Sequence, residues 1–388
     1  MKSFKDLDKK YIMNTYNRYD VELVEGSGCI VKDIQGKSYI DLSSGIGVNS
    51  LGFCDKKWSK AVSKQAKKLN HVSNLYYSQP CVTLAKKLCK RTGYDSVFFA
   101  NSGAEANEGA IKVARKYSFD KYKEGRSTIV TLVNSFHGRT ITTLSATGQD
   151  VFHNYFYPFT EGFKYIEANN IQLLKEALTK DVCAVMFECI QGEGGVMELS
   201  KEYVQELVKI CKNKDILVIC DEVQTGVGRT GYFLASQYYD IKPDITTLAK
   251  GLGGGLPIGA FLVKKKLSAT LGYSMHGTTF GGNPIVCAGA NVVVDTINED
   301  FLNEVKNKAD YIRKALSEID EIKSITGIGL MIGLELKTKK ASDVVKEGIK
   351  NGLIMLTAKS KVRLLPPLVI TYEEIDQAID ILKNILKK

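Results

Sequence analysis

The sequence has little that marks it for a membrane, for export or for a metal ion. Its 388 residues contain no apolar run of membrane-spanning length, and the opening stretch MKSFKDLDKKYIMNTYNRYD lacks the apolar core of a secretory signal. Only four histidines are present, and none has metal-ligand spacing. We therefore expect a cytoplasmic protein that binds no metal, and His137 and His276, which flank motifs described below, are not predicted to be ligands.

Signals for disulfides and for disorder are equally scarce. The nine cysteines are odd in number, form no CxxC pair, and in several cases lie inside apolar runs such as ILVICDEV. We expect buried free thiols in a reducing compartment. With 7 prolines, 44% hydrophobic residues and 25% charged residues, the composition is typical of a folded soluble chain.

The net charge of +10 raises the question of a nucleic-acid partner. The lysine pairs are dispersed along the chain, and no basic run carries interleaved aromatic residues. A solvated basic surface explains the charge better, and it would mildly attract anionic small molecules. We expect small-molecule substrates and no nucleic acid.

Apolar runs of strand length alternate with helical patterns through the middle of the chain. Helical patterns cover 102–117 and 201–213. The predicted strands are SVFFA (96–100), STIVTLV (127–133), VCAVMFE (182–188), ILVICD (216–221), DITTLA (244–249) and GAFLVK (259–264). This alternation favours an α/β fold in which helices cover both faces of a mostly parallel sheet.

The two ends of the chain have a different pattern. Short strands and tight turns are predicted in 1–50, whereas 285–388 mixes helices with the extended stretches GLMIGLELK and VRLLPP. One helical run is expected from the GGNP stretch to about residue 319, and an amphipathic helix closes the chain. We predict that 1–50 and 285–388 form one smaller α+β domain beside a large domain, 51–284.

Three polar segments follow predicted strands, at the edge where open parallel sheets bind ligands. In FFANSGAEANEGAIKV, Ser102 fits an N-cap position and the small residues Gly103 and Ala104 follow it. The start of that helix offers backbone N–H groups to a phosphate, although a plain capped helix fits the same residues.

Asp221 and Lys250 end neighbouring strands. A carboxylate after the apolar run ILVIC needs a cation or a protonated ring nitrogen, or else it caps the next turn. Lys250 is followed by four glycines in five positions, which indicates backbone packed closely against a neighbour. A lysine, a carboxylate and a phosphate cradle together suit pyridoxal 5′-phosphate (PLP), a phosphorylated aromatic aldehyde.

A dinucleotide-binding oxidoreductase is the alternative from another class. GVGRTG contains the spacing GxGxxG at 226, 228 and 231, but five residues, two of them acidic, separate it from the apolar run ILVIC, where the fingerprint needs an immediate turn. A colourless protein that binds nicotinamide cofactor would favour this alternative.

Seven motifs occur in the order found in the class III (ω-type) PLP-dependent aminotransferases, which the chain resembles from about residue 15 to its end. They are NSGAEANE, FHGRT, ECIQGEGG, DEVQTGVGRTG, TLAKGLGGGLPIGA, HGTTFGGNP and RLLPPLVIT. The resemblance implies the PLP fold-type I architecture and a homodimer with shared active sites.

The activity that the resemblance implies is ping-pong transfer of the δ-amino group of N2-acetylornithine to 2-oxoglutarate, in arginine synthesis. The products are N-acetylglutamate 5-semialdehyde and glutamate. Succinylornithine, N-succinyl-diaminopimelate, ornithine and 4-aminobutyrate are alternative donors.

The resemblance also assigns residues to the cofactor. Lys250 binds its aldehyde and then moves the substrate proton, and Asp221 keeps its ring nitrogen protonated. Phe136 and Val223 pack on the two ring faces, while Gln224 hydrogen-bonds the phenolic oxygen. The phosphate is expected on Ser102, Gly103 and Ala104, with Thr279 contributed by a neighbouring subunit.

Four further residues are assigned to the substrates. Arg139 is expected to bind the distal carboxylate of the acylated donor, and Arg363 the α-carboxylate of glutamate. Glu193 masks Arg363 while the terminal amine reacts, and Thr278 contacts the substrate across the interface. Without the resemblance, each arginine would be interpreted as a surface ion pair. The combination of Arg363 with Glu193 favours a two-substrate transaminase over a mutase or a decarboxylase on the same fold.

Overall fold

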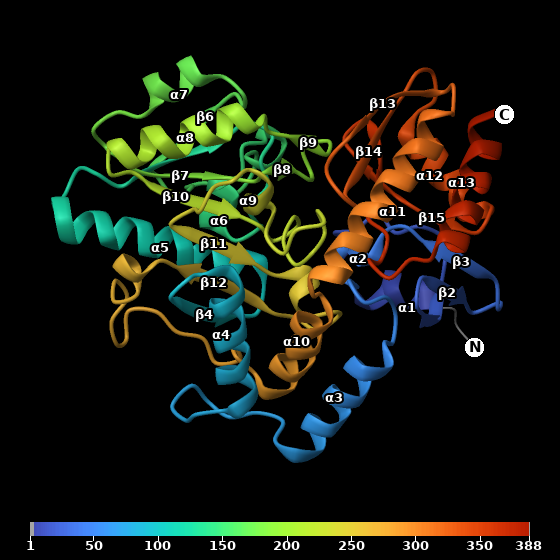
Figure 1. Cartoon of the computed structure of the whole chain (residues 1–388), viewed down its shortest axis with the longest axis horizontal. Coiled ribbons are helices and arrows are strands. Elements are labelled where there is room, and N and C mark those ends of the chain that lie inside the picture. The colour runs from blue at the N-terminus through green and yellow to red at the C-terminus, as the bar shows by residue number, and fades with distance from the viewer. Residues whose placement is uncertain (1–3, 388) are drawn as a thin grey trace.

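A seven-stranded sheet forms the centre of the larger of two bodies in the computed structural model, which describes residues 4–387 (Figure 1). In spatial order its strands are β4 (Ser96–Ala100), β12 (Gly259–Val263), β11 (Ile245–Leu248), β10 (Leu217–Asp221), β7 (Val182–Phe187), β5 (Thr128–Leu132) and β6 (Phe163–Ile166). All neighbours run parallel except β12, which is antiparallel to both β11 and β4. The six predicted strands are present with each end within one residue, and β6 is an additional edge strand.

Helices cover both faces of this sheet, which explains why its strands are apolar throughout. In β10, Leu217 and Ile219 pack on the face covered by α5 (Gly103–Tyr122), while Val218 and Cys220 pack on the face covered by α8 (Lys201–Asn213). The remaining elements of this body are α3 (Lys56–Lys68), α4 (Gln79–Thr92), α6 (Ile141–Ala146), α7 (Ile171–Ala177), α9 (Ala235–Tyr238), α10 (Pro284–Thr296), the short β8 (Ile190–Gln191) and β9 (Met197–Glu198), and the turns η1 (Asp150–Phe152), η2 (Lys250–Leu252) and η3 (Lys265–Leu267).

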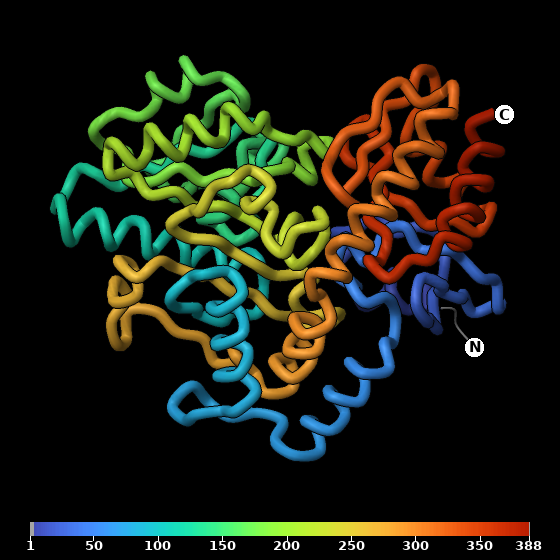
Figure 2. Tube along the Cα trace, viewed as in Figure 1, coloured from blue at the N-terminus to red at the C-terminus, as the bar shows by residue number. Residues whose placement is uncertain are grey.

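Both chain ends meet in the smaller body, where Figure 2 shows the N-terminal and C-terminal segments side by side. One sheet has the order β1 (Leu23–Ser27), β2 (Ile30–Asp33), β3 (Ser38–Asp41), β15 (Leu353–Ile354), and β3 pairs in parallel with β15. The other has the order β13 (Ile322–Thr326), β14 (Ile332–Leu336), β17 (Lys361–Leu364), β16 (Leu356–Ala358). The helices here are α2 (Ser44–Gly47), α11 (Glu299–Ser317), α12 (Ala341–Lys350) and α13 (Tyr372–Lys387), preceded by α1 (Phe4–Tyr11). The α/β class with a smaller α+β body from both chain ends is therefore confirmed, while the boundaries at residues 50 and 284 stay a prediction. α10, which the prediction assigns to the smaller domain, packs against α3 and α4 of the larger body.

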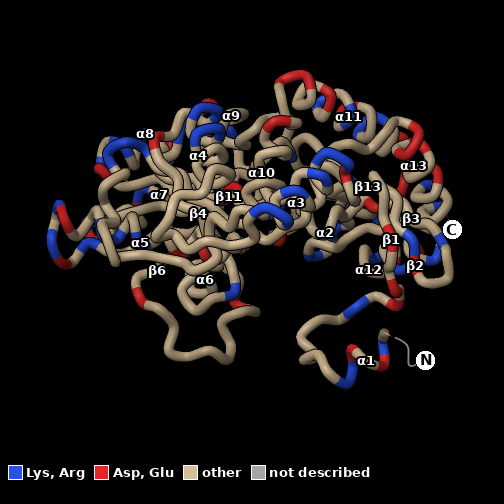
Figure 3. Tube along the Cα trace, turned by 90° about the horizontal axis from the view of Figure 1, so that it is seen from below, with Lys and Arg blue, Asp and Glu red and all other residues tan. Residues whose placement is uncertain are grey.

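The C-terminal helical run differs from its prediction, because it is two helices rather than one. α10 ends at Thr296, and the Asn298 side chain then accepts a hydrogen bond from Phe301 N to begin α11. Within residues 4–387, no helix is long and apolar enough to cross a membrane. Basic and acidic residues are scattered along the backbone (Figure 3), as the dispersed lysine pairs indicated.

Six of the nine cysteines are buried, Cys81 and Cys89 are half-buried, and Cys54 is exposed. The expectation of buried thiols is therefore confirmed for most positions and wrong for Cys54. That residue has φ of +54° in the turn before α3, where the chain faces solvent.

Candidate active site

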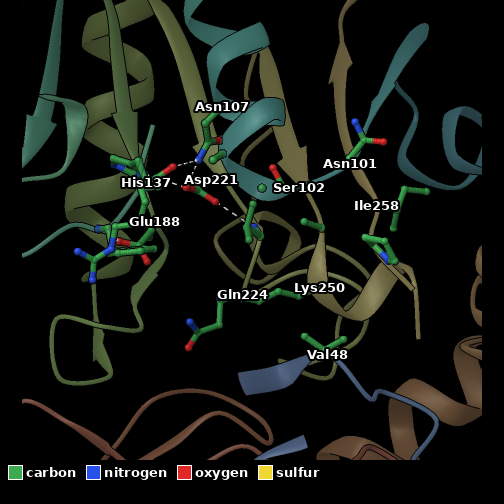
Figure 4. Close-up of a pocket in the computed structure, with 18 of the residues that line it drawn as sticks. Val48, Asn101, Ser102, Asn107, His137, Glu188, Asp221, Gln224, Lys250 and Ile258 are labelled. Atoms are coloured by element: carbon green, nitrogen blue, oxygen red, sulfur yellow. Dashed lines mark hydrogen bonds and ion pairs between the residues drawn. The ribbon is translucent and has the colours of Figure 1, made fainter. Parts of the chain in front are cut away.

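A cavity of about 480 Å³ lies where β10 and β11 end and α5 begins. Nine residues singled out in the sequence line it: Ser102, Gly103, Ala104, Phe136, Arg139, Asp221, Val223, Gln224 and Lys250. Figure 4 shows several of them converging from different elements, with Val48 of the N-terminal segment on one wall. The sheet edge chosen from the sequence is thus the edge that carries the cavity.

The start of α5 forms one end of the cavity. Ser102 Oγ accepts a hydrogen bond from Glu105 N at 3.2 Å, which caps the helix, and Glu105 Oε2 accepts one from Asn101 N at 2.8 Å, which ties the preceding residue to the first turn. A Cβ on Gly103 would lie 2.7 Å from Val223 Cγ1, and only glycine allows this approach. The first N–H groups of a helix lack partners within it, so this end suits a phosphate.

Asp221 is held by partners that the sequence reasoning missed. Its Oδ2 accepts a hydrogen bond from Asn107 Nδ2 at 2.8 Å and lies 2.8 Å from His137 Nδ1. Its Oδ1 accepts one from Val223 N at 3.0 Å. The Asp221 side chain is only 4% exposed. Because a carboxylate only accepts hydrogen bonds, the His137 proton belongs on Nδ1.

His137 therefore orients an acid. Within the described residues, His137 Nε2 and Asn107 Oδ1 are buried without a hydrogen-bond partner. The sequence did hold a signal for Asn107, which follows Gly103 by one helical turn on α5 and so shares a face with it. Nothing local connects His137 with Asp221, which are 84 positions apart.

Lys250 begins the turn η2, directly after β11 and Ala249, with φ of +42°. The glycines that follow are needed for close packing, since a Cβ on Gly251 would lie 2.5 Å from Ser50 Oγ. Among residues 4–387, Lys250 Nζ has no hydrogen-bond or ion-pair partner, and burial lowers its pKa below the ordinary value. A free amine of lowered pKa is suited to covalent bonding with an aldehyde.

Glu188 joins two loops at the cavity and was also missed. Its carboxylate accepts hydrogen bonds from Phe136 N at 3.0 Å and from Gly192 N at 3.3 Å. Burial, and then the charge of Asp221, raise the pKa of this carboxyl well above its ordinary value. Glu188 thus fixes the backbone at Phe136 and the loop that leads to Glu193.

Arg363 and Glu193 form a two-pronged ion pair beside the cavity. The distances are 2.6 Å from Nη1 to Oε1 and 3.4 Å from Nη2 to Oε2, and Gln224 contacts both partners. The Arg363 side chain is 3% exposed and that of Glu193 30%. Burial alone would raise the pKa of Glu193, but the Arg363 charge outweighs it and the pKa is lowered. The pair is therefore closed, and it is not a surface ion pair.

The other residues that the resemblance assigns to the substrates and to the neighbouring subunit are Arg139, Thr278 and Thr279. The exposed Arg139 guanidinium stacks 3.9 Å from the Phe152 ring centroid and 5.4 Å from that of Phe136. Thr278 Oγ1 accepts a hydrogen bond from Asn101 Nδ2 at 3.1 Å. Thr279 is exposed and does not line the cavity among the described residues of its own chain.

The GVGRTG stretch does not lie as a nucleotide fingerprint requires. Val227 and Arg229 are buried, and no helix begins at this stretch within residues 4–387, since the next one, α9, starts at Ala235. A dinucleotide fingerprint opens a helix toward the ligand.

The residues around the cavity fit PLP on three counts. They provide the unpartnered amine of Lys250 and the buried carboxyl group of Asp221, which two donors orient. They also provide the start of α5, where only a glycine at position 103 fits against Val223. These three groups meet the aldehyde, the ring nitrogen and the phosphate of that cofactor.

Known proteins resemble the chain over nearly its whole length. A family model described as aminotransferase class-III matches residues 11–386. Acetylornithine aminotransferase of Haemophilus ducreyi is 52% identical over 386 residues, covering 99% of this chain and 98% of that protein. The enzyme of the same name from Methanocaldococcus jannaschii is 47% identical, covering 98% and 97%.

Two solved structures show the same architecture. The ornithine aminotransferase of Toxoplasma gondii superposes with a TM-score of 0.94 at 32% identity, covering 100% of this chain and 96% of that one. The N-acetylornithine aminotransferase of Stenotrophomonas maltophilia superposes with a TM-score of 0.85 at 35% identity, covering 98% of each chain.

Proposed function

The chain belongs to the class-III aminotransferases, which are PLP enzymes, and we propose that it transfers the δ-amino group of N2-acetylornithine to 2-oxoglutarate. The observation that carries this proposal is the closed Arg363–Glu193 pair next to the cavity that holds Lys250. An enzyme that accepts a terminal amine in one half-reaction and glutamate in the other needs a carboxylate site that can be masked. Ornithine, which like acetylornithine reacts at its δ-amine, is the main alternative donor.

PLP, when bound, supplies an electron sink for the negative charge that develops on the substrate carbon losing its proton. Lys250 would hold the cofactor aldehyde, Asp221 its ring nitrogen, and Ser102, Gly103 and Ala104 its phosphate. Asn107 Nδ2 and His137 Nδ1 both contact Asp221 Oδ2 and so hold this carboxyl group in place toward the ring nitrogen.

Lys250 also suits the proton transfer. Its amine lies in the cavity without a competing partner, and its lowered pKa brings it closer to neutral pH. A base with a pKa near the working pH takes a proton efficiently and returns it. We assign to Lys250 Nζ the proton of the amine-bearing carbon.

Charge placement separates the two substrates. Arg139 presents an exposed guanidinium at the mouth, suited to the carboxylate at the far end of acetylornithine from the reacting amine. Glutamate carries a second carboxylate next to its reacting amine, and this group would displace Glu193 from Arg363. Glu193, which is 30% exposed, has solvent to move into.

We propose that the enzyme works as a homodimer in the cytoplasm. Four large side chains are exposed on the two segments 76–77 and 273–280: Tyr76, Tyr77, Tyr273 and Phe280. The segments that carry them are joined where Asn74 Nδ2 donates to Thr278 O and Gly281 O, each at 3.0 Å. Exposed aromatic clusters of this kind are typical of protein interfaces, and a second copy seated here would bring Thr278 and Thr279 to its neighbour's cavity. The free thiols fit a reducing compartment. Light scattering should give twice the mass of one chain.

A donor screen tests the substrate assignment. The purified enzyme is assayed with 2-oxoglutarate and each of acetylornithine, succinylornithine, ornithine, N-succinyl-diaminopimelate and 4-aminobutyrate, and kcat/KM is compared. Acetylornithine should give the highest value, and a clear preference for ornithine or 4-aminobutyrate would contradict the proposal.

The variant Arg139→Ala tests whether Arg139 binds the carboxylate of acetylornithine. It should lower kcat/KM for acetylornithine by about 10- to 100-fold and that for glutamate much less, because a lost charged hydrogen bond raises the barrier for one substrate only. Arg126→Ala serves as the control, since that guanidinium bonds carbonyl groups at the opposite end of the sheet. Equal losses for both substrates in Arg139→Ala would refute the role.

A further inference from the structure

Arg229 is a buried cation to which the proposed reaction gives no task. It lies in the loop between β10 and α9 and is only 2% exposed. Burial lowers its pKa to about 9, a shift that the charge of Asp41 partly opposes. No carboxylate of the described residues comes within 4.0 Å of the guanidinium. Burying a charge without an ion-pair partner costs free energy, and in Arg229 hydrogen bonds to the guanidinium offset that cost.

Those hydrogen bonds lead to the two strands that hold Arg363. Nη1 donates to Pro366 O at 2.5 Å, three residues after Arg363, where the chain leaves β17. The same nitrogen donates to Leu330 O at 3.1 Å, and Leu330 N donates back to Arg229 O at 3.0 Å. Leu330 leads into β14, in which Gly333 pairs with Arg363. Arg229 thus ties the cofactor-bearing body to both strands around Arg363.

The third hydrogen bond reaches the wall of the cavity. Nη2 contacts Ser44 Oγ at 3.3 Å, and that hydroxyl donates to Leu365 O. Ser44 has φ of +41° and Ile46 φ of +67°, so this turn holds two side-chain-bearing residues in the left-handed region. Such residues are strained and persist only where their surroundings hold them. The turn ends at Val48, which lines the cavity.

We propose that Arg229 is a positioning residue for the substrate carboxylate, an inference that rests on the proposed function. By holding Pro366, Leu330 and Ser44 at once, it sets where Arg363 and the Val48 wall lie relative to Lys250. Only a planar fork of donors can reach three acceptors on separate segments, and a lysine at this position would keep the charge but lose that reach.

Arg229→Lys is the decisive variant, and each half-reaction is followed separately as a single turnover through the absorbance of the bound cofactor. Arg229→Lys should weaken the glutamate half-reaction about tenfold, mainly through KM, and the acetylornithine half-reaction less than about threefold. Its dissociation constant for glutarate, a dicarboxylate without the amine, should rise by a similar factor in calorimetry. Ser44→Ala, which keeps the buried charge, should shift glutamate in the same direction by a smaller factor.

Two controls separate the possible failures. Arg126→Lys alters another arginine that bonds carbonyl groups and should leave the ratio of the two half-reactions unchanged. Arg363→Lys should lose the glutamate half-reaction; if it does not, the proposed function is wrong. If Arg363→Lys behaves as expected but Arg229→Lys slows both half-reactions equally, or neither, the positioning role is refuted. Should Arg229→Lys fail to fold, the same comparison with Ser44→Ala decides.

Discussion

Replacing Glu193 with glutamine should make the enzyme a better glutamate transaminase and a poorer acetylornithine transaminase. Glutamate can reach Arg363 only after the pair with distances of 2.6 and 3.4 Å has opened. A hydrogen bond between charged groups contributes about 1.5–3 kcal/mol, and the 30% exposure of Glu193 places this pair in the lower part of that range. Opening it therefore costs about 1.5–2 kcal/mol, which corresponds to about 10- to 30-fold in affinity.

Glu193→Gln keeps the shape and the contact with Gln224 but removes the charge, so kcat/KM for the glutamate half-reaction should rise by about that factor. The acetylornithine half-reaction should fall, because the buried Arg363 charge then faces the donor without a carboxylate to neutralise it. Single-turnover kinetics of each half-reaction measure both changes. Glu335→Gln, which breaks the exposed pair with Lys323, is the matched control. A loss in both half-reactions, or an unchanged glutamate rate, would refute Glu193 as the mask.

Three further predictions concern the expected phosphate site at the start of α5, the Arg363–Glu193 ion pair and the thiols. Gly103→Ala should weaken PLP binding at least about tenfold in a cofactor titration, because its Cβ would lie 2.7 Å from Val223 Cγ1. Gly272→Ala, whose Cβ would have its nearest neighbour 3.9 Å away, should leave the affinity unchanged. Folding lowers the pKa of Glu193 below its ordinary value of 4.5, so the ion pair stabilises the protein above pH 4.5 and this stabilisation is lost as the pH falls through the lowered pKa. The Tm difference between wild type and Glu193→Gln should therefore shrink on acidification. A Tm difference that stays constant with pH would contradict this. In the native protein, a thiol reagent should modify Cys54 first, and Cys54→Ser should remove the fastest phase.

The strands were predictable because the sheet is covered on both faces, so its central strands read as unbroken apolar runs such as ILVICD. β6 was missed since it is an edge strand with the mixed sequence FKYI, in which Tyr165 is exposed. The break between α10 and α11 was missed because the apolar pattern continues across it, and only the Asn298 cap marks it. Local pattern thus identifies buried strands better than edges and helix ends.

In the candidate active site as well, local sequence pattern identifies some residues and not others. Asp221 and Lys250 could be found because each follows an apolar strand, where a charged residue is conspicuous. His137, Glu188 and Arg229 could not, because their partners come from other strands and loops and no fixed spacing relates them. Their roles depend on which segments the fold brings together.

The covalent bond between Lys250 and the cofactor aldehyde can be tested directly. The purified holoenzyme is reduced with borohydride, digested, and mapped by mass spectrometry, with Lys250→Arg as the control. We predict a reduced pyridoxyl group on Lys250 and none in the variant. A reduced wild-type protein without that group, or with it on another lysine, would contradict the assignment of the active site.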